Sequence, residues 1–521
     1  MHPLALFLFA ATIILLGRMP VITAPPWDID EGIYASIGQA LRAGELLYVD
    51  VWDNKPPGIY FLYEWISRFS LSYTAPRYVA TFFLIATAGA LFYLARTVFS
   101  RNAAGWVLGI FSFLAIVPIL ETHISNAEIF FLLPTSLAIL LTVLIEFKTW
   151  SPRWYLLVGL LLGVGFLFKT LVLFDGLAIL SLLIFKYGRR AFKDLGLVAL
   201  GGLLVLIAPG IYLVNGGLTD DFIRAAFLNN FGYVREGNLT TVSFIDISNP
   251  FITVGGKILA LGLAIWGIRR QFHKVTPVTL FYLWLVWTIF GALLSGRPYL
   301  HYLIASMGAI SLLIPHFWGM VRPAVRIKRL NLGDWVRGLG VVGALILALA
   351  LGFGGKIQLI IGTPELSRYA EGYYTNAYRY LSGQISQAAY FDFYGEPVVL
   401  NLRLRDYILQ NTTPTDRIYI WGNAPWVYFL TGRTPAAKYL VAYHLTFVKE
   451  AKAETLNELT ADPPELVIVT NEPSYFDEAG SPTPKWPEFD RYLSDNFVLK
   501  DRVGSADIFI RKGRLLAGSY D

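Results

Sequence analysis

Residues 26–58, PWDIDEGIYASIGQALRAGELLYVDVWDNKPPG, hold the side chains best suited to chemistry. They follow directly on an apolar segment, residues 3–22, that is long enough to span a bilayer. Carboxylates beside lipid are costly unless they face water or a partner, so their grouping favours a working site. A solvated acidic loop explains the same charge pattern equally well. The ionisable residues of this stretch include Asp28, Asp30, Glu31, Asp50, Asp53 and Lys55.

Two motifs in this stretch place opposite charges close together. In DIDEGIY, Asp28 is positioned to cap a helix, whereas Asp30 and Glu31 are candidate catalytic carboxylates. In WDNKPPG, the Pro-Pro turn fixes the backbone beside Lys55, and an ammonium at the headgroup level suits a lipid phosphate. The alternative for Lys55 is the ordinary placement of a lysine at a membrane interface. Asp53 is a candidate for lining the same cavity.

A second set of candidates lies between apolar segments further along the chain. In ETHISNAEIF, Glu121, His123 and Glu128 could reach the same outer cavity, and solvated loop positions are an equal alternative. In GFLFKT, Lys169 lies near the outer end of an apolar segment. We expect it to contact a phosphate there, although a lysine at a membrane interface explains the position as well.

The motif GRPYLHY contributes Arg297 and His301. These residues are spaced i, i+4, so they share one face if a single helix includes both. An Arg-plus-His pair at the headgroup level suits a phosphate, and His301 is also a candidate metal ligand. The alternative is an aromatic-rich interfacial anchor that includes Tyr299 and Tyr302.

The composition is that of a polytopic membrane protein. Hydrophobic residues make up 55% of the chain and charged residues only 15%, against roughly 25% charged in soluble domains. The apolar excess lies in about eleven segments long enough, or nearly long enough, to cross a bilayer. The formal charge of +6 comes from cations between these segments, so nucleic-acid binding is excluded. The absence of cysteine excludes disulfides, thiolate metal sites and cysteine nucleophiles.

The distribution of cations predicts the topology. Alternate loops carry most of the Lys and Arg, which places those loops and the N-terminus in the cytoplasm and the acidic stretch and C-terminus outside it. We therefore expect a multi-pass protein of the inner or plasma membrane. The predicted segments after 3–22 are 75–99, 102–121, 127–147, 154–171, 173–186, 195–214, 251–268, 275–295, 298–318 and 336–355.

Shorter elements complete the predicted organisation. Residues 1–355 form a transmembrane catalytic domain, whose first outer loop, 23–74, carries two helices lying along the membrane. The polar stretch 215–250 is a lid or a plain connector. Residues 356–521 form an α/β domain outside the membrane, with strands at RIYIWG, ELVIVT and SADIFIRK. Neither a Walker loop nor GxGxxG opening a βαβ unit is present, which argues against a nucleotide-driven pump.

Several of these segments resemble a known family. DEGIYASIGQALRAGELLYVDVWDNKPPGIY is similar to the first periplasmic loop of GT-C fold glycosyltransferases, in particular the bacterial dolichyl-phosphate-mannose–protein mannosyltransferase and aminoarabinose transferase (ArnT-like) group. NAEIFFLLPTSLAILL, GLLLGVGFLFKT, GRPYLHYLIASMGAISLL and WGNAPWVYFLTGRTPAAKY are also similar to that group. The resemblance covers the membrane part well and the C-terminal domain loosely.

The resemblance implies an enzyme of the cell envelope that transfers a hexose or pentose. Its donor would be a polyprenyl-phosphate-linked sugar, and its acceptor the hydroxyl of a lipid, glycan or protein. By the resemblance, Asp30 would be the base in a single inverting displacement. Glu31 would have an orienting or charge-neutralising role. Lys55 would hold the donor phosphate, assisted by the cations of the later motifs, Arg297, His301 and Lys169.

One departure from the resemblance concerns a metal. Aminoarabinose transferases tend to carry Glu just before Lys-Pro-Pro, where it can take part in a metal site, and here that position is Asn54. A divalent metal ion is therefore left open, with Asp53, Glu128 and His301 as the candidate ligands. The rival function is a transporter or flippase of lipid-linked sugars. A transporter predicts charged residues at the midplane and broken helices in matched halves, whereas the ionisable residues here gather at one face.

Overall fold

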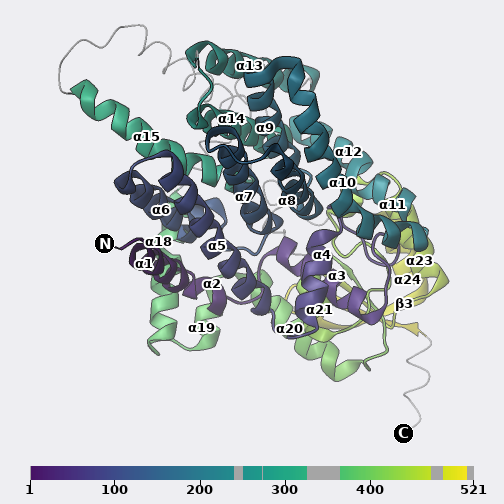
Figure 1. Ribbon diagram of the computed structural model, residues 1–521. Helices are drawn as coiled ribbons and strands as arrows, with labels where there is room; N and C mark the ends of the chain where they lie inside the picture. Colours follow the sequence, from purple (N-terminus) through teal and green to yellow (C-terminus); the bar gives the residue numbers. More distant parts are fainter. Residues whose placement is uncertain are drawn as a thin grey trace. The chain divides into compact units, whose positions relative to one another are not determined.

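The computed structural model describes residues 2–239, 250–272, 274–297, 299–325, 364–470 and 485–512. The chain folds into two compact units, each assembled from stretches far apart in the sequence. Unit 1 comprises Met1–Ile22, Arg77–Ile211 and Tyr233–Tyr374, and unit 2 comprises Thr23–Pro76, Tyr212–Gly232 and Thr375–Asp521 (Figure 1). The predicted domain boundary at 355/356 and the predicted span 336–355 lie outside the described residues.

Unit 1 consists of packed apolar helices. Among the described residues, five helical stretches are long and apolar enough to cross a membrane, and three shorter apolar helices accompany them. Most of them coincide with the predicted segments to within a few residues, as α7 does with 127–147. The helix α6 ends at Ile116, short of the predicted end at 121, and the stretch Val172–Asn215 covers the two predicted segments 173–186 and 195–214. The elements are α1 (Pro3–Gly17), α2 (Met19–Thr23), α5 (Ala75–Val98), α6 (Arg101–Ile116), η1 (Pro118–Leu120), α7 (Ala127–Phe147), η2 (Pro152–Trp154), α8 (Tyr155–Phe168), α9 (Val172–Tyr187), η3 (Gly188–Ala191), α10 (Phe192–Asn215), α13 (Pro250–Gln271), α14 (Pro277–Leu294), η5 (Leu300–Ser306), α15 (Met307–Val325) and α18 (Pro364–Leu381), with parts of α2, α5, α10 and α18 extending into unit 2.

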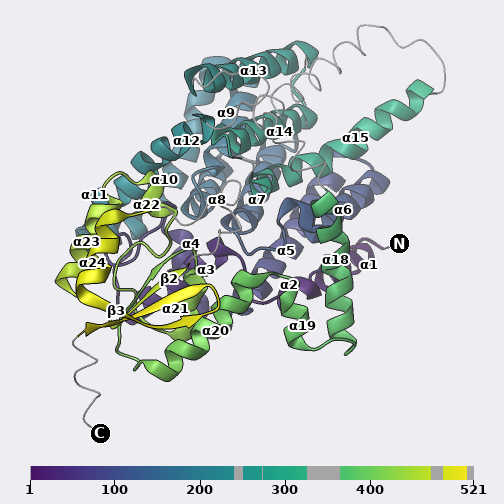
Figure 2. The ribbon, with the colours of Figure 1, turned by 180° about the vertical axis from the view of Figure 1, so that it is seen from behind.

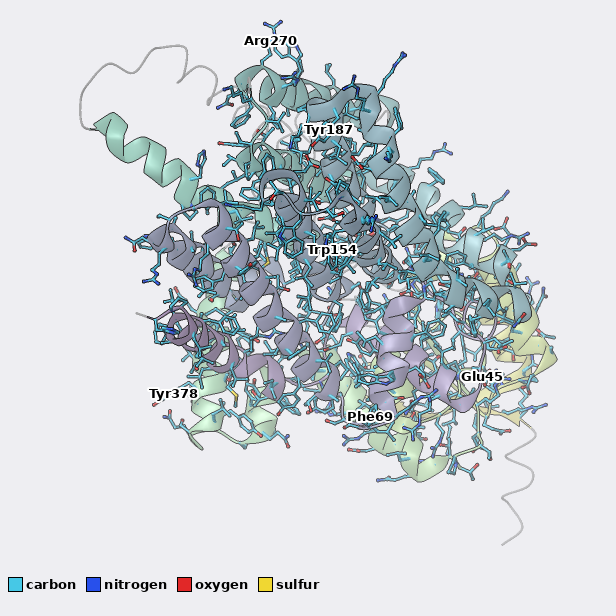
Figure 3. The ribbon with its side chains drawn as sticks, viewed as in Figure 1. Glu45, Phe69, Trp154, Tyr187, Arg270 and Tyr378 are labelled. Atoms are coloured by element: carbon cyan, nitrogen blue, oxygen red, sulfur yellow. The ribbon has the colours of Figure 1, made fainter. Side chains whose placement is uncertain are left out.

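Cationic residues gather at one end of unit 1. Lys186 Nζ lies 2.8 Å from Glu146 Oε2, which joins the C-terminal ends of α9 and α7. The Arg269 guanidinium lies 5.5 Å from the centre of the Phe185 ring, which adds the end of α13. Figure 3 shows Tyr187 and Arg270 at these ends. Helix ends beside three of the loops predicted to be cytoplasmic therefore lie close together, and the start of α7 lies a full helix length away from them.

Unit 2 contains a four-stranded sheet in the order β1-β2-β4-β3. Figure 2 labels β2 and β3 of this sheet. β1 (Ile418–Trp421) and β2 (Leu466–Thr470) pair in parallel, and β4 (Ala506–Arg511) pairs antiparallel with β2 and with β3 (Phe497–Val503). The three predicted strands are present. β3 is an additional strand that sequence alternation does not indicate, because most of its residues are exposed at the sheet edge. The helices around the sheet are α19 (Gln387–Asp392), α20 (Glu396–Asn411), α21 (Pro425–Thr431), α22 (His444–Phe447), α23 (Ala451–Ala461) and α24 (Pro487–Asn496).

The stretch predicted as a lid or plain connector is helical over most of its described part. It forms α11 (Thr219–Ile223), the π-helical turn η4 (Arg224–Leu228) and α12 (Asn229–Leu239). Leu218, Ala225 and Ala226 are buried and give this stretch an apolar side that its polar composition conceals. Residues 240–249 lie outside the described part of the chain.

Two short helices of the first outer loop position the candidate site. α3 (Ile29–Ala43) begins at Asp28, whose side chain accepts the backbone N–H of Glu31, and ends at Gly44, whose φ of 103° stops the helix. α4 (Gly58–Ser67) follows the Pro-Pro turn. A Cβ at Gly38 would lie 2.8 Å from the backbone of α4, so glycine permits the close packing of the two helices.

Candidate active site

Lys55 is the centre of a buried charge cluster in unit 2. Its Nζ lies 3.1 Å from Asp53 Oδ2 and 3.6 Å from Asp30 Oδ1, and only 10% of its side chain is exposed. The ammonium also lies 5.0 Å from the centre of the Tyr34 ring, on the same helix as Asp30. The structure thus brings together the acid of the DIDEGIY motif and the lysine of the WDNKPPG motif, which the sequence separates by a helix.

Asp53 is fully buried and receives several donors. The Tyr60 hydroxyl donates to Oδ2 at 2.8 Å, and the Asn54 backbone N–H donates to Oδ1 at 2.7 Å. Burial alone would raise the pKa of Asp53, but the Lys55 charge, the neighbouring His444 and the Asn54 N–H outweigh it and hold that pKa well below its usual range. Asp53 is therefore an anion at neutral pH and neutralises Lys55.

His444, from α22, is a part of this cluster that sequence reasoning missed. Its Nε2 lies 3.4 Å from Asp53 Oδ1, its side chain is fully buried, and its ring packs 4.9 Å from that of Trp52. Burial lowers the pKa of His444, with Asp53 opposing the shift, so the imidazole is neutral at neutral pH. A lone histidine in a C-terminal segment carries no sequence signal that would connect it to residue 53.

The backbone around Lys55 is held by two tyrosines that were also missed. The Lys55 N–H donates to the Tyr60 hydroxyl at 3.2 Å, and the Tyr48 hydroxyl donates to the Lys55 carbonyl at 2.8 Å. Asn54 and Asn230 exchange hydrogen bonds of 3.1 Å, which connects the turn to α12. The turn that carries the lysine is therefore held from several sides.

The two candidate catalytic carboxylates of α3 lie in different surroundings. Asp30, in the first turn, keeps 23% of its side chain exposed and faces Lys55, with the Tyr34 hydroxyl 3.4 Å from Oδ2. Glu31 is only 1% exposed. Asp30 is thus the carboxylate that both touches the cation and remains accessible, whereas Asp28 serves as the helix cap.

Glu128 and Lys169 lie in unit 1 and form an ion pair with each other. Glu128 is fully buried at the start of α7, and the Lys169 ammonium, after the end of α8, also lies 4.5 Å from the centre of the Tyr302 ring. The structure thus brings the motifs ETHISNAEIF and GFLFKT together within the unit. Lys169 is already neutralised by a carboxylate, so it would bind a phosphate only by exchanging that partner.

His301 pairs with Glu121, at 2.5 Å between Nδ1 and Oε2. The condition for a shared helical face of Arg297 and His301 is not met, because the helix η5 begins at Leu300 and does not include Arg297. The Arg297 guanidinium instead lies 4.3 Å from the centre of the Tyr233 ring. Pro298 lies outside the described residues.

His123 lies in a cationic environment in unit 1. Its ring packs 5.4 Å from that of Tyr373, and its side chain is 5% exposed. Burial, together with the charges of Arg18 and Arg77, lowers the pKa of His123 to about 3. The imidazole is therefore neutral at physiological pH and does not act as a proton donor there.

The candidate metal ligands do not form a metal site in the described structure. No group of three or more His, Asp or Glu side chains close enough to hold a metal ion occurs among the described residues. Asp53 faces Lys55, Tyr60 and the Asn54 N–H, all of which donate, and a cation would have to displace them. Within unit 1, Glu128 and His301 are paired with Lys169 and Glu121, respectively.

Comparisons with known proteins agree with this architecture. Residues 54–212 match the family described as dolichyl-phosphate-mannose-protein mannosyltransferase. The chain is similar in structure to ArnT from Cupriavidus metallidurans bound to undecaprenyl phosphate, with a TM-score of 0.57, 16% identity and 97% of each chain covered. For apo ArnT the TM-score is 0.54 and the identity 18%, again over 97% of each chain. No curated protein sequence matches significantly.

These similarities define the class of protein. The chain is a multi-pass helical membrane protein with the GT-C fold, and its C-terminal part contains a small α/β sheet. The resemblance to GT-C glycosyltransferases of the protein mannosyltransferase and ArnT-like group, which the sequence motifs indicate, is confirmed by the matched family and by the shared fold.

Proposed function

We propose that this chain is a membrane glycosyltransferase that moves a sugar from a polyprenyl-phosphate-linked donor to an acceptor hydroxyl. The observation that carries the proposal is the position of the Lys55 ammonium between Asp30 and Asp53. A buried cation beside an accessible carboxylate supplies both a phosphate-binding group and a base. The similar ArnT structure contains undecaprenyl phosphate, which supports a lipid-linked donor here.

The proposed reaction is a single displacement at the anomeric carbon of the donor sugar. The acceptor oxygen forms a bond to that carbon while the bond from carbon to the phosphate oxygen breaks, with inversion. The proton of the acceptor hydroxyl passes to Asp30, and polyprenyl phosphate leaves as an anion whose charge is stabilised by Lys55. Glu31, buried beside Asp30, acts on the position of the first turn rather than on the substrate.

Donor binding redistributes the charges around Lys55. Of its two carboxylate partners, Asp53 is buried and lies closer, whereas Asp30 is more exposed and is 3.6 Å away. A donor phosphate can therefore replace Asp30 at the ammonium while Asp53 keeps its place. This exchange leaves Asp30 without its cation and makes it available to receive the acceptor proton.

The proposed site faces the side of the membrane away from the cytoplasm. The ends of α7, α9 and α13, beside three of the loops rich in Lys and Arg, lie together through the Lys186–Glu146 pair and the Arg269–Phe185 contact. The positive-inside rule assigns this end to the cytoplasm. The loop that carries Asp30 and Lys55 belongs to the opposite set of connections, so the donor and acceptor are taken from outside.

The test is transfer activity in membranes supplied with a panel of polyprenyl-phosphate sugars. Wild type is compared with Asp30→Asn, which retains the shape of the side chain but removes the base. We expect one donor to be used, and a loss of about 100-fold or more in kcat in the variant while donor binding persists. Equal activity in the variant would remove Asp30 from the mechanism. Inactivity of wild type with every donor would favour the transporter alternative, which predicts donor movement across the membrane without sugar release.

A further inference from the structure

The motif WGNAPW, residues 421–426, is not used by the proposed reaction, yet its second tryptophan touches the candidate catalytic helix. The Trp426 Nε1–H donates to the backbone carbonyl of Asp28 at 2.6 Å, within unit 2. The same carbonyl accepts the Gly32 N–H at 3.1 Å, which is the first hydrogen bond of α3. The indole is 1% exposed, so this contact is fully withdrawn from water.

The contact belongs to a continuous packed face of α3. A Cβ on Gly32 would lie 2.9 Å from Trp426 Cδ1 and 3.0 Å from Pro425 Cγ, so only glycine allows this approach. One turn further on, the Ser36 hydroxyl donates to the Pro425 carbonyl at 2.8 Å. Positions 28, 32 and 36 form one stripe of the helix, and the start of α21 covers this stripe.

Asp30 lies on the other side of the same helical turn. At 3.6 residues per turn it is rotated about 200° from Asp28, together with Tyr34, and this side faces Lys55. A rotation or shift of the first turn against α21 therefore changes the distance between Asp30 and Lys55 directly. The Lys55 turn is held separately, by Asp53, Tyr60 and Tyr48.

We propose that Trp426 is a positioning residue for Asp30. Its indole N–H fixes the first turn of α3 on the side opposite Lys55 and so sets the position of the Asp30 carboxylate relative to the proposed donor site. The inference rests on the proposed function, because it takes Asp30 as the base. It assigns to the C-terminal part of the chain a role in the reaction itself. Removing the indole N–H should impair the proton-transfer step more than donor binding, since Asp53, Tyr60 and Tyr48, which hold Lys55 independently of α3, are untouched.

The experiment compares Trp426→Phe with Trp421→Phe and Asp30→Asn in one transfer assay on the purified full chain, with the active polyprenyl-phosphate sugar as donor. Trp421 is a matched control, because it is also buried but packs on Trp486 and Phe489 at the start of α24 rather than on α3. We expect Trp426→Phe to lower kcat about 10-fold with donor KM within about twofold, corresponding to one hydrogen bond of about 1.4 kcal/mol. Trp421→Phe should leave both constants near wild type.

Hydrogen exchange gives a readout that does not require turnover. Amides of residues 28–36 should exchange faster in Trp426→Phe and not in Trp421→Phe, because the helix start loses its support. Gly32→Ala, whose Cβ pushes α3 away from the intact indole, should show the same kcat and exchange effects.

Three results would overturn the inference. In the first, Trp426→Phe behaves like Trp421→Phe in kcat, KM and exchange. In the second, both variants lose activity, donor affinity and thermal stability together, which indicates a structural role only. In the third, Asp30→Asn is as active as wild type. That last result removes the proposed base as well, whereas an inactive Asp30→Asn beside a fully active Trp426→Phe overturns the role of Trp426 alone.

Discussion

The Tyr60 hydroxyl donates to Asp53 at 2.8 Å, and the same oxygen accepts the Lys55 N–H at 3.2 Å. One side chain therefore holds both the backbone of Lys55, the proposed phosphate-binding lysine, and the anion that neutralises it. Burial, reinforced by the charge of Asp53, raises the pKa of Tyr60 well above its usual value, so the phenol keeps its proton and remains a donor.

Tyr60→Phe should weaken donor binding. The substitution leaves the shape of the ring but removes one donor to Asp53 and one acceptor for the Lys55 N–H, so we expect donor KM to rise about 10-fold. Tyr428→Phe is the matched control, since the Tyr428 hydroxyl accepts the Ile420 N–H in the sheet. The control should lower thermal stability without changing KM. A Tyr60→Phe variant with unchanged KM would show that the turn does not need this hydroxyl.

Asp53 predicts a loss of stability in acid. Its folded pKa is held below the ordinary value of 3.8, so its contribution is fully present above that pH and is lost as the pH falls through the lower folded value. Thermal unfolding of the detergent-solubilised protein between pH 2 and 7 measures this dependence. Asp53→Asn should be less stable than wild type at neutral pH, and the difference should shrink below about pH 4. A difference that stays constant across the range would contradict the assigned charge state.

The lowered pKa of His444 predicts that stability also depends on pH in a higher pH range. Its pKa is lowered by burial, so the unfolded chain binds a proton more readily than the folded one. Its contribution to stability is therefore fully present above the ordinary value of 6.5 and is lost as the pH falls through the lower folded value. His444→Gln should flatten the fall of Tm just below pH 6.5. His123, whose pKa is also lowered, to about 3, stays in place in this variant and contributes to the slope that remains.

The Glu128–Lys169 pair in unit 1 can be tested by a double-mutant cycle. Lys169→Met leaves the fully buried Glu128 without its cation, and we expect a loss of about 3 kcal/mol in the free energy of unfolding. Glu128→Gln in the same chain should recover most of that loss, because no unpaired charge then remains. Additive losses in the double variant would show that the two side chains do not act as a pair. Undecaprenyl phosphate binding, measured on the same variants, tests the predicted phosphate contact of Lys169.

Much of the helical architecture follows from local sequence. The apolar run 127–147 is long enough to be a helix whatever it packs against, and α7 has those bounds. Asp28 before DEGIY predicts a helix start, and the structure shows that cap. The helices of the polar stretch after residue 215 were not predicted, because its few buried side chains, Leu218, Ala225 and Ala226, give no strong periodicity to detect.

The sequence by itself determined the class of protein, most of its helices and the two motifs that carry Asp30 and Lys55, because hydropathy, capping and turn residues act over short distances. Only the tertiary structure decided that unit 2 joins residues 23–76 to the C-terminal part of the chain, with His444 beside Asp53 and Trp426 behind α3. These contacts join residues about 390 to 400 positions apart. They arise from the packing of buried aromatic surfaces, which leaves no spacing in the sequence that names the partner.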